Sequence, residues 1–153
     1  MVDINQLAEL SRLAETLNKE TDTYTDALAQ LEKKLRKMNL GVEAWVCLKA
    51  VGTKGTPERG TSIDTMLGYA KTPDGWGFAV KDVRVENGLY EGYEDCPWEN
   101  AYEQGEPKLL LKSSREVRML AAQRIEYLLS ELQTRMTEAI KSLQEARTLA
   151  ERI

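Results

Sequence analysis

The side chains best suited to ligand chemistry in this sequence are a set of aromatic rings and a cationic, hydroxyl-bearing segment. The segment KSSREVR, residues 112–118, places two serines and three cations where we predict the start of a helix. A helix N-terminus attracts anions through its free backbone N–H groups, and rings on neighbouring strands could stack a flat, nucleotide-like ligand. The candidate ligand-binding residues are Trp45, Tyr69, Trp76, Phe78, Ser113, Ser114, Arg115 and Arg118.

A plainer interpretation accounts for the same residues without a ligand. Serines at a helix start commonly cap the helix, and the two arginines could pair with carboxylates of residues 86–107. Aromatic residues on adjacent strands stabilise a sheet by packing against one another. The sequence favours this structural interpretation for both groups of residues.

Two further segments share only part of a binding motif. GTKGTPERGT, residues 52–61, is rich in glycine, but it lacks the Gly-Lys-Ser/Thr ending of a phosphate-binding loop. We therefore predict a mobile hairpin loop there. Residues 86–107 hold seven acidic residues, no basic residue and four interleaved aromatic rings, without the spacing of a calcium loop. The rings could recognise a cationic partner or, as we favour, pin an acidic loop to the sheet.

Composition narrows the chemistry that the chain can perform. The 153 residues include no histidine, the commonest general base and metal ligand. The two cysteines, Cys47 and Cys96, are too few for a disulfide framework or a zinc site. The net charge is −4 and no strongly basic face is evident, so nucleic-acid binding is not expected. Because the chain has neither a membrane-spanning apolar run nor the pattern of a signal peptide, we expect a cytoplasmic protein without membrane association. Because it lacks histidine and a catalytic motif, we expect a non-enzymatic protein without cofactor or metal.

Three strands are predicted in the middle of the chain. Alternation of apolar and polar residues predicts strands within residues 42–51, 62–71 and 75–86. The TPDG corner, residues 72–75, joins the last two as a hairpin, because proline fixes φ at the first turn position and glycine takes the left-handed conformation. The apolar parity of the third strand slips near residues 81–82, which predicts a bulge or a bend there.

A long helix is predicted at each end of the chain. Residues 2–39 and 114–152 carry apolar residues at alternating intervals of three and four, the spacing of a coiled-coil seam. The first helix should stop at Asn39, and the second, about 39 residues long, should begin at a capping box formed by Ser113 and Glu116. The predicted oligomer seam consists of Leu10, Leu17, Tyr24, Leu28, Leu31, Leu35, Leu132, Met136 and Leu143.

Together these elements predict a single α+β domain over residues 1–153. Two long antiparallel helices would flank a small antiparallel β-meander at residues 42–86, and an acidic aromatic loop would follow at residues 87–112. Burying the apolar positions outside the seam against a second copy would form a four-helix bundle, so we expect a homodimer or a higher homo-oligomer. Those positions include Leu13, Leu120, Leu128 and Ile140.

We would expect this helix–sheet–helix arrangement in a bacterial protein. Two functions are compatible with it. The first is a non-enzymatic oligomeric binding or interaction protein, whose helices mediate self-association and whose sheet end binds an unknown protein partner. The alternative is a protein that binds or sequesters a small anionic molecule, such as a nucleotide, at the candidate ligand-binding residues. They differ in whether the isolated protein carries a bound small molecule.

Overall fold

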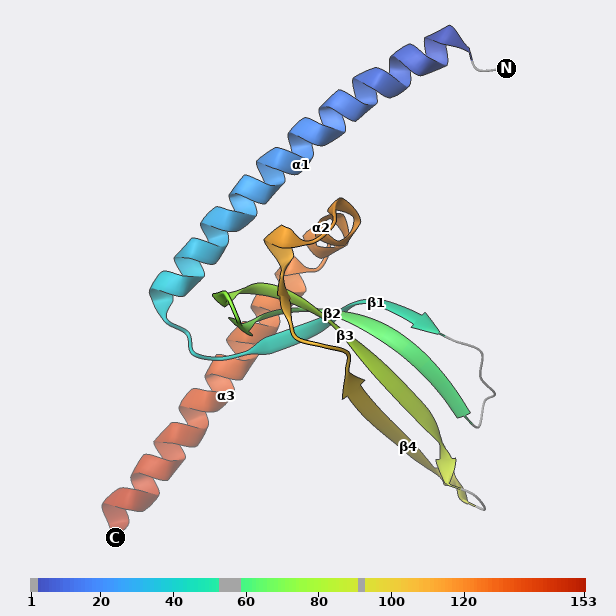
Figure 1. Ribbon diagram of the computed structural model, residues 1–153. Helices are drawn as coiled ribbons and strands as arrows, with labels where there is room; N and C mark the ends of the chain where they lie inside the picture. Colours follow the sequence, from blue (N-terminus) through green and yellow to red (C-terminus); the bar gives the residue numbers. More distant parts are fainter. Residues whose placement is uncertain (1–2, 53–58, 91–92) are drawn as a thin grey trace.

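The computed structural model of the protein is an antiparallel sheet with helices packed against it (Figure 1), and it describes residues 3–52, 59–90 and 93–153. The strands are β1 (Ala44–Gly52), β2 (Arg59–Thr72), β3 (Gly75–Tyr90), β4 (Tyr93–Glu103) and β5 (Lys108–Leu109). The helices are α1 (Ile4–Met38), the short 3-10 helix η1 (Leu110–Lys112), α2 (Arg115–Ala122) and α3 (Ile125–Arg152). Strands β1 to β4 pair in sequence order, and β5 pairs with β3. The predicted α+β class and the antiparallel meander are confirmed.

The hairpin of β2 and β3 lies at the centre of the sheet and has the predicted turn. Thr72 and Gly75 are the last paired residues, and Gly75 has a φ of +105°. The Thr72 hydroxyl accepts a hydrogen bond from the Asp74 backbone N–H (3.1 Å) and donates one to the Gly75 carbonyl (2.9 Å). Glycine reverses the chain here because it tolerates a positive φ without the strain that a side chain would cause.

A fourth strand replaces most of the acidic loop that the sequence predicts at residues 87–112. β3 continues to Tyr90, and β4 returns along it from the Leu89–Pro97 pair to the Val83–Glu103 pair. This ribbon extends away from the helices (Figure 1), and the described side chains of Glu99 and Glu103 on β4 are exposed to solvent. The loop prediction is wrong because a high density of acidic residues is compatible with an exposed strand. The other predicted loop, at residues 52–61, lies for the most part outside the described residues.

The predicted bulge near residues 81–82 is wrong. The pairing of β2 with β3 is continuous from Arg59–Gly88 to Thr72–Gly75. The apolar residues of β3 move from one face of the strand to the other because the helices cover only the end of β3 next to the turn. Val80 faces the core, whereas Val83 lies on the opposite face of the same strand. The register shifts instead in β1, between Cys47 and Lys49.

The hydrophobic core lies between one face of the sheet and the helices. Its fully buried large side chains are Leu67, Tyr69, Phe78, Leu110, Leu128 and Leu132. Leu28 and Leu35 join this cluster from α1. Each such side chain contributes roughly 1.5–3 kcal/mol when it leaves water, so the sheet is the surface on which both long helices are held.

The two long helices do not form the predicted antiparallel pair. In Figure 1 both run from upper right to lower left. α1 packs against β3 and η1, whereas α3 packs against β1 and β2. The buried part of each apolar stripe packs on the sheet. As a consequence, the start of α1 and the end of α3 project from opposite ends of the molecule.

The second predicted helix consists of two helices. α2 ends at Ala122 and α3 begins at Ile125. α2 contacts α1, where Arg118 bonds Thr25, whereas α3 packs against β1 and β2. One straight helix of 39 residues cannot make both sets of contacts. The start of α2 is close to the prediction, with Ser114 as its N-cap.

Candidate interaction surfaces

The four aromatic residues proposed as ligand-stacking rings do not form one site. Tyr69 and Phe78 are 1% and 0% exposed, and their ring centroids lie 6.0 Å apart in an edge-to-face arrangement within the core. Trp76 stacks on Tyr69 at 5.6 Å and lines a cleft of about 390 Å³ together with Arg36. Trp45 lies on the opposite face of the sheet. These rings pack in the fold as the plainer interpretation expected, and burial raises the pKa of Tyr69.

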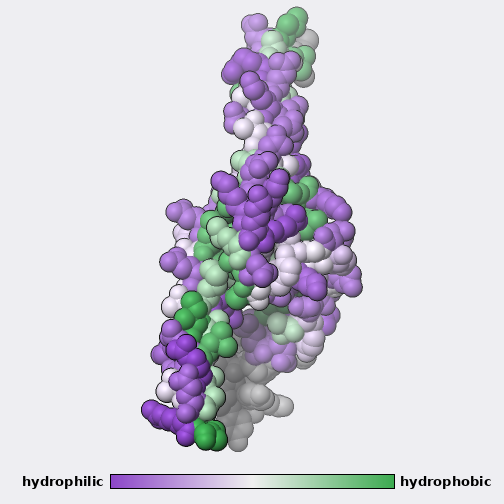
Figure 2. Space-filling model, turned by 90° about the vertical axis from the view of Figure 1, so that its left-hand side faces the viewer, coloured by the Kyte–Doolittle hydropathy of each residue, from purple (hydrophilic) through white to green (hydrophobic). Residues whose placement is uncertain are grey.

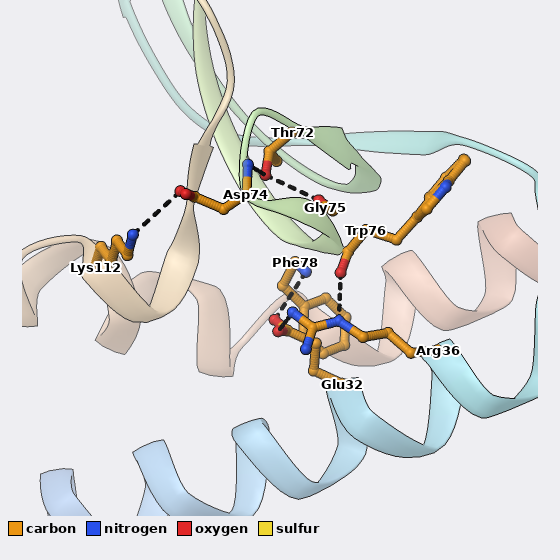
Figure 3. Close-up of polar contacts among 8 residues, drawn as sticks. All are labelled: Glu32, Arg36, Thr72, Asp74, Gly75, Trp76, Phe78 and Lys112. Carbon is orange, nitrogen blue, oxygen red and sulfur yellow. Dashed lines mark hydrogen bonds and ion pairs between the residues drawn. The ribbon is translucent and has the colours of Figure 1, made fainter.

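Two side chains of α1 complete the edge of β3 next to the turn (Figure 3). Glu32 accepts a hydrogen bond from the Phe78 backbone N–H (3.1 Å), and Arg36 Nε donates to the Trp76 carbonyl (2.5 Å). Glu32 and Arg36 also form an ion pair with each other. On the edge of β3 that faces away from β2, strand pairing begins only at Ala79, with β5. The pair therefore takes the place of a neighbouring strand at Trp76 and Phe78, where backbone groups would otherwise lack partners.

A glycine makes this approach of α1 to the strand feasible. A Cβ at Gly77 would lie 2.8 Å from Glu32 Cδ, closer than ordinary packing permits. The Glu32 side chain is 3% exposed, so it has little room to move away. Sequence analysis missed this contact, although one signal was present: Glu32 is a charged residue adjacent to the apolar stripe of Leu28 and Leu35.

The segment KSSREVR uses its hydroxyl groups in the fold. The Ser114 side chain accepts a hydrogen bond from the Val117 backbone N–H at 3.4 Å, and the Ser113 hydroxyl donates to the Leu109 carbonyl at 3.2 Å. Lys112 forms an ion pair with Asp74 of the hairpin turn at 3.1 Å (Figure 3). A cleft of about 610 Å³ lies beside these residues, and Lys108 also lines it. The capping interpretation is confirmed for Ser114.

Among the side chains that the structure describes, the two arginines of the segment bind α1 and not the acidic residues of 86–107. Arg115 donates to the Asn18 side chain, and Arg118 donates to the Thr25 hydroxyl at 2.8 Å. Within the part of the chain that the structure describes, the buried Arg118 Nε and Tyr24 hydroxyl have no hydrogen-bond partner. Burial also raises the pKa of Tyr24. These arginines therefore fasten α2 to α1 and do not converge on the proposed aromatic rings.

The face of the sheet opposite the core carries a cluster around Trp45. The Trp45 ring covers Gly68, where an added Cβ would lie 2.4 Å from the ring atoms. Lys81 Nζ lies 4.0 Å from the centre of that ring, a favourable cation–π distance, and pairs with Glu103 of β4 at 3.0 Å. Cys47 is exposed on the same face. This face is amphipathic around Trp45, and the Lys81 side chain on it is 13% exposed.

The rings of the acidic segment are described only in part. Tyr102 is 42% exposed, and Arg84 Cζ lies 5.1 Å from the centre of its ring. The side chains of Tyr90, Tyr93 and Trp98 lie outside the described part of the structure, as does that of Cys96. The prediction that rings pin this segment to the sheet stays a prediction.

Two projecting helix segments expose most of the large apolar side chains outside the core. We call residues 4–20 of α1 the N-terminal arm and residues 140–152 of α3 the C-terminal arm; every residue in both is exposed. Figure 2 shows hydrophobic side chains among hydrophilic ones along both projecting ends. The large apolar residues of the arms are Ile4, Leu7, Leu10, Leu13, Leu17, Ile140, Leu143 and Leu149, between 41% and 81% exposed.

The predicted seam is divided between the core and the arms. Leu28, Leu35 and Leu132 are buried in the core, and Leu10, Leu17 and Leu143 are exposed on the arms. The remaining three, Tyr24, Leu31 and Met136, are half-buried. Of the positions predicted to be exposed outside the seam, Leu13 and Ile140 are exposed, Leu120 is half-buried, and Leu128 is fully buried. Leu128 was misplaced because the sheet covers α3 more widely than a partner helix would.

No protein-family model, curated protein or solved structure matches this chain. Among the described residues, no group of three or more Cys, Asp or Glu side chains could hold a metal ion. The described helices contain no stretch long and apolar enough to cross a bilayer. Function must therefore be inferred from the surfaces themselves.

Proposed function

We propose that this protein is a non-enzymatic interaction protein that self-associates through its two arms and offers the sheet face that carries Trp45 to a protein partner. The observation that carries the proposal is the exposure of apolar stripes on both arms, with Leu10 54% and Leu143 70% exposed. Soluble monomers rarely expose contiguous apolar patches of this kind, whereas interaction surfaces do. Self-association would bury them.

The sheet face that carries Trp45 supports the second half of the proposal. The Trp45 ring lies next to the exposed Cys47, and Lys81 and Glu103 form an ion pair beside it. Aromatic side chains are enriched in surfaces that bind proteins, where a polar rim surrounds them. Pull-down with the wild-type protein and with Lys81→Glu as baits in extract of the source organism tests this part, and Lys33→Glu, at an exposed position of α1 outside the arms, is the charge-matched control. We expect a partner protein that the wild type and the control capture and that Lys81→Glu does not. If both variants capture it equally, this face is not the binding surface.

Sedimentation velocity across a range of concentrations tests self-association. We expect the wild-type protein to sediment as an oligomer and Leu10→Glu to lose most of this assembly, because the variant places a charge in an apolar contact. Thr16→Glu is the matched control, since it adds the same charge to the same arm away from the stripe and should assemble as the wild type does. A wild-type protein that stays monomeric at high concentration would reject the proposal.

A second candidate function, binding of a small anion, is favoured by one observation. The cleft of about 610 Å³ at the start of α2 is lined by two cations, Lys108 and Lys112, and by two carboxylates, Asp74 and Glu106. Lys112 is paired with Asp74, so Lys108 is the cation that we propose for the anion. An anion bound there would raise the melting temperature by mass action. We expect phosphate or a nucleotide to raise the melting temperature of the wild-type protein but not that of the Lys108→Glu variant. Equal melting curves with and without these anions would eliminate this function.

A further inference from the structure

The apolar stripes of both arms continue a seven-residue repeat that begins in the core. In α1 the repeat comprises Leu7, Leu10, Ala14, Leu17, Thr21, Tyr24, Leu28, Leu31 and Leu35. In α3 it comprises Ile125, Leu129, Leu132, Met136, Ala139, Leu143, Ala146 and Ala150. A helix that only covers a sheet needs apolar residues over the length of the sheet, whereas a sustained spacing of 3.5 residues is the signature of a helix wound against another helix. The repeat outside the core therefore indicates that each arm is covered by a helix.

The helix that covers an arm cannot come from the same described chain. Figure 1 shows the N-terminal arm and the C-terminal arm at opposite ends of the molecule, and the rest of both helices is held on the sheet. A second copy, however, offers both arms. The two-fold symmetry of a homodimer would let the same contact form twice.

The two arms are complementary in side-chain size. The stripe of the N-terminal arm presents mainly leucine, at Leu7, Leu10 and Leu17. The stripe of the C-terminal arm presents alanine at two of three positions, Ala146 and Ala150. Large side chains pack best opposite small ones, because the two helices can then approach closely without voids. Each arm therefore fits the other better than it fits its own copy.

The arms are also complementary in charge. The N-terminal arm contains three acidic and two basic side chains, and the C-terminal arm contains three basic and two acidic ones. Pairing two N-terminal arms would bring two acidic segments together, whereas pairing an N-terminal with a C-terminal arm brings opposite net charges together. Charged residues that flank an apolar seam determine which helices pair in this way.

We propose that two copies of this chain form a reciprocal dimer in which the N-terminal arm of each packs along the C-terminal arm of the other. This inference rests on the proposed self-association and specifies its contacts. Since α1 and α3 run in the same general direction, a two-fold axis across that direction reverses the second copy and makes both helix pairs antiparallel. One symmetry operation covers all four arms, and the contact closes without leaving an arm for a third copy.

Mixing two single variants tests the reciprocal pairing. In a reciprocal dimer, Leu10→Glu disturbs both contacts of its homodimer, and so does Leu143→Lys. A mixed dimer of the two variants has one wild-type contact and one contact that carries Glu against Lys. We expect each variant alone to dimerise at least about tenfold more weakly than the wild type. We expect the equimolar mixture to form mixed dimers, which native mass spectrometry identifies when one variant is isotopically labelled.

The alternative pairing predicts a different result for the same variants. If N-terminal arms pair only with N-terminal arms, Leu143→Lys lies outside the contact, and this variant alone dimerises as strongly as the wild type. That outcome would overturn the reciprocal dimer and leave self-association intact. Single variants that dimerise as strongly as the wild type would overturn both, as would a monomeric wild-type protein. Circular dichroism and melting of each variant verify the fold, which is expected to be unchanged because Leu10 and Leu143 are exposed.

Discussion

At the scale of single residues, the most specific contact is between Glu32 and the edge of β3. The Glu32 carboxylate accepts a hydrogen bond from the Phe78 N–H and lies close to Gly77. The same carboxylate atoms therefore make the hydrogen bond and leave no space for a side chain at position 77. Leaving a buried N–H without a partner costs about 1–3 kcal/mol. Overpacking a buried site by one methyl group costs a similar amount, about 1–3 kcal/mol.

These two costs predict strong coupling between Glu32 and Gly77. Glu32→Ala and Gly77→Ala should each lower the free energy of unfolding by about 1–3 kcal/mol. The double variant should lose less than the sum, because the alanine at position 77 no longer meets a carboxylate. Urea denaturation of the four proteins measures the coupling. Lys33→Ala, an exposed neighbour on α1, is the control and should add independently to Gly77→Ala; an additive result for Glu32 would contradict the contact.

At the scale of elements, patterns with local causes were predictable and those with distant causes were not. The TPDG corner predicts the hairpin, because proline and glycine fix the turn within four residues. The acidic β4 was missed since its pairing depends on β3 and not on its own charges. The division at Gln123 and Arg124 was missed because neither residue breaks a helix; the contacts of α2 with α1 and of α3 with the sheet impose it.

The candidate sites show the same limit. Ser114 was recognisable as a cap from its place before the helix, and its role is local. Arg118 was assigned to the acidic segment or to a ligand, yet it bonds Thr25, 93 positions away in the sequence. The seam leucines were correctly recognised as apolar stripes, but whether the sheet or solvent covers each one depends on where the sheet ends.

The two parts of α1 should differ in how their protection from hydrogen exchange depends on concentration. Residues 21–35 pack on the sheet and should exchange slowly at every protein concentration. Amides of the N-terminal arm should exchange fast in dilute solution and slow down as the protein associates, because helix ends without tertiary contacts open readily. Exchange measured by mass spectrometry at two concentrations distinguishes them. Equal protection of the arm at both concentrations would contradict the arm as an association surface.

At the scale of the whole molecule, two tyrosines make stability sensitive to alkaline pH. Burial raises the pKa of Tyr24 and of Tyr69 above the ordinary value of 10.0. Below pH 10 both phenols are protonated in folded and unfolded chains, so their contribution is fully present. As the pH rises above 10, the unfolded chain loses these protons first, and the free energy of unfolding falls.

Urea denaturation at pH 9 and pH 11 measures this loss of stability. The Tyr24→Phe variant should lose less stability than the wild type between these two values, because phenylalanine does not ionise. At pH 9 it should be at least as stable as the wild type, since the Tyr24 hydroxyl is buried without a partner among the described residues. A variant with the same loss of stability as the wild type would show that Tyr24 does not contribute to the alkaline sensitivity.

The Glu32–Arg36 pair also has a consequence for solubility. An uncovered strand edge is a template for a strand of another chain, and repeated additions of this kind build fibrils. At Trp76 and Phe78 the backbone groups of β3 are bonded by two side chains, so another chain finds no ladder to extend there. Because a charged, i to i+4 pair occupies this edge, the apolar β2–β3 hairpin is protected from polymerisation while the protein remains folded.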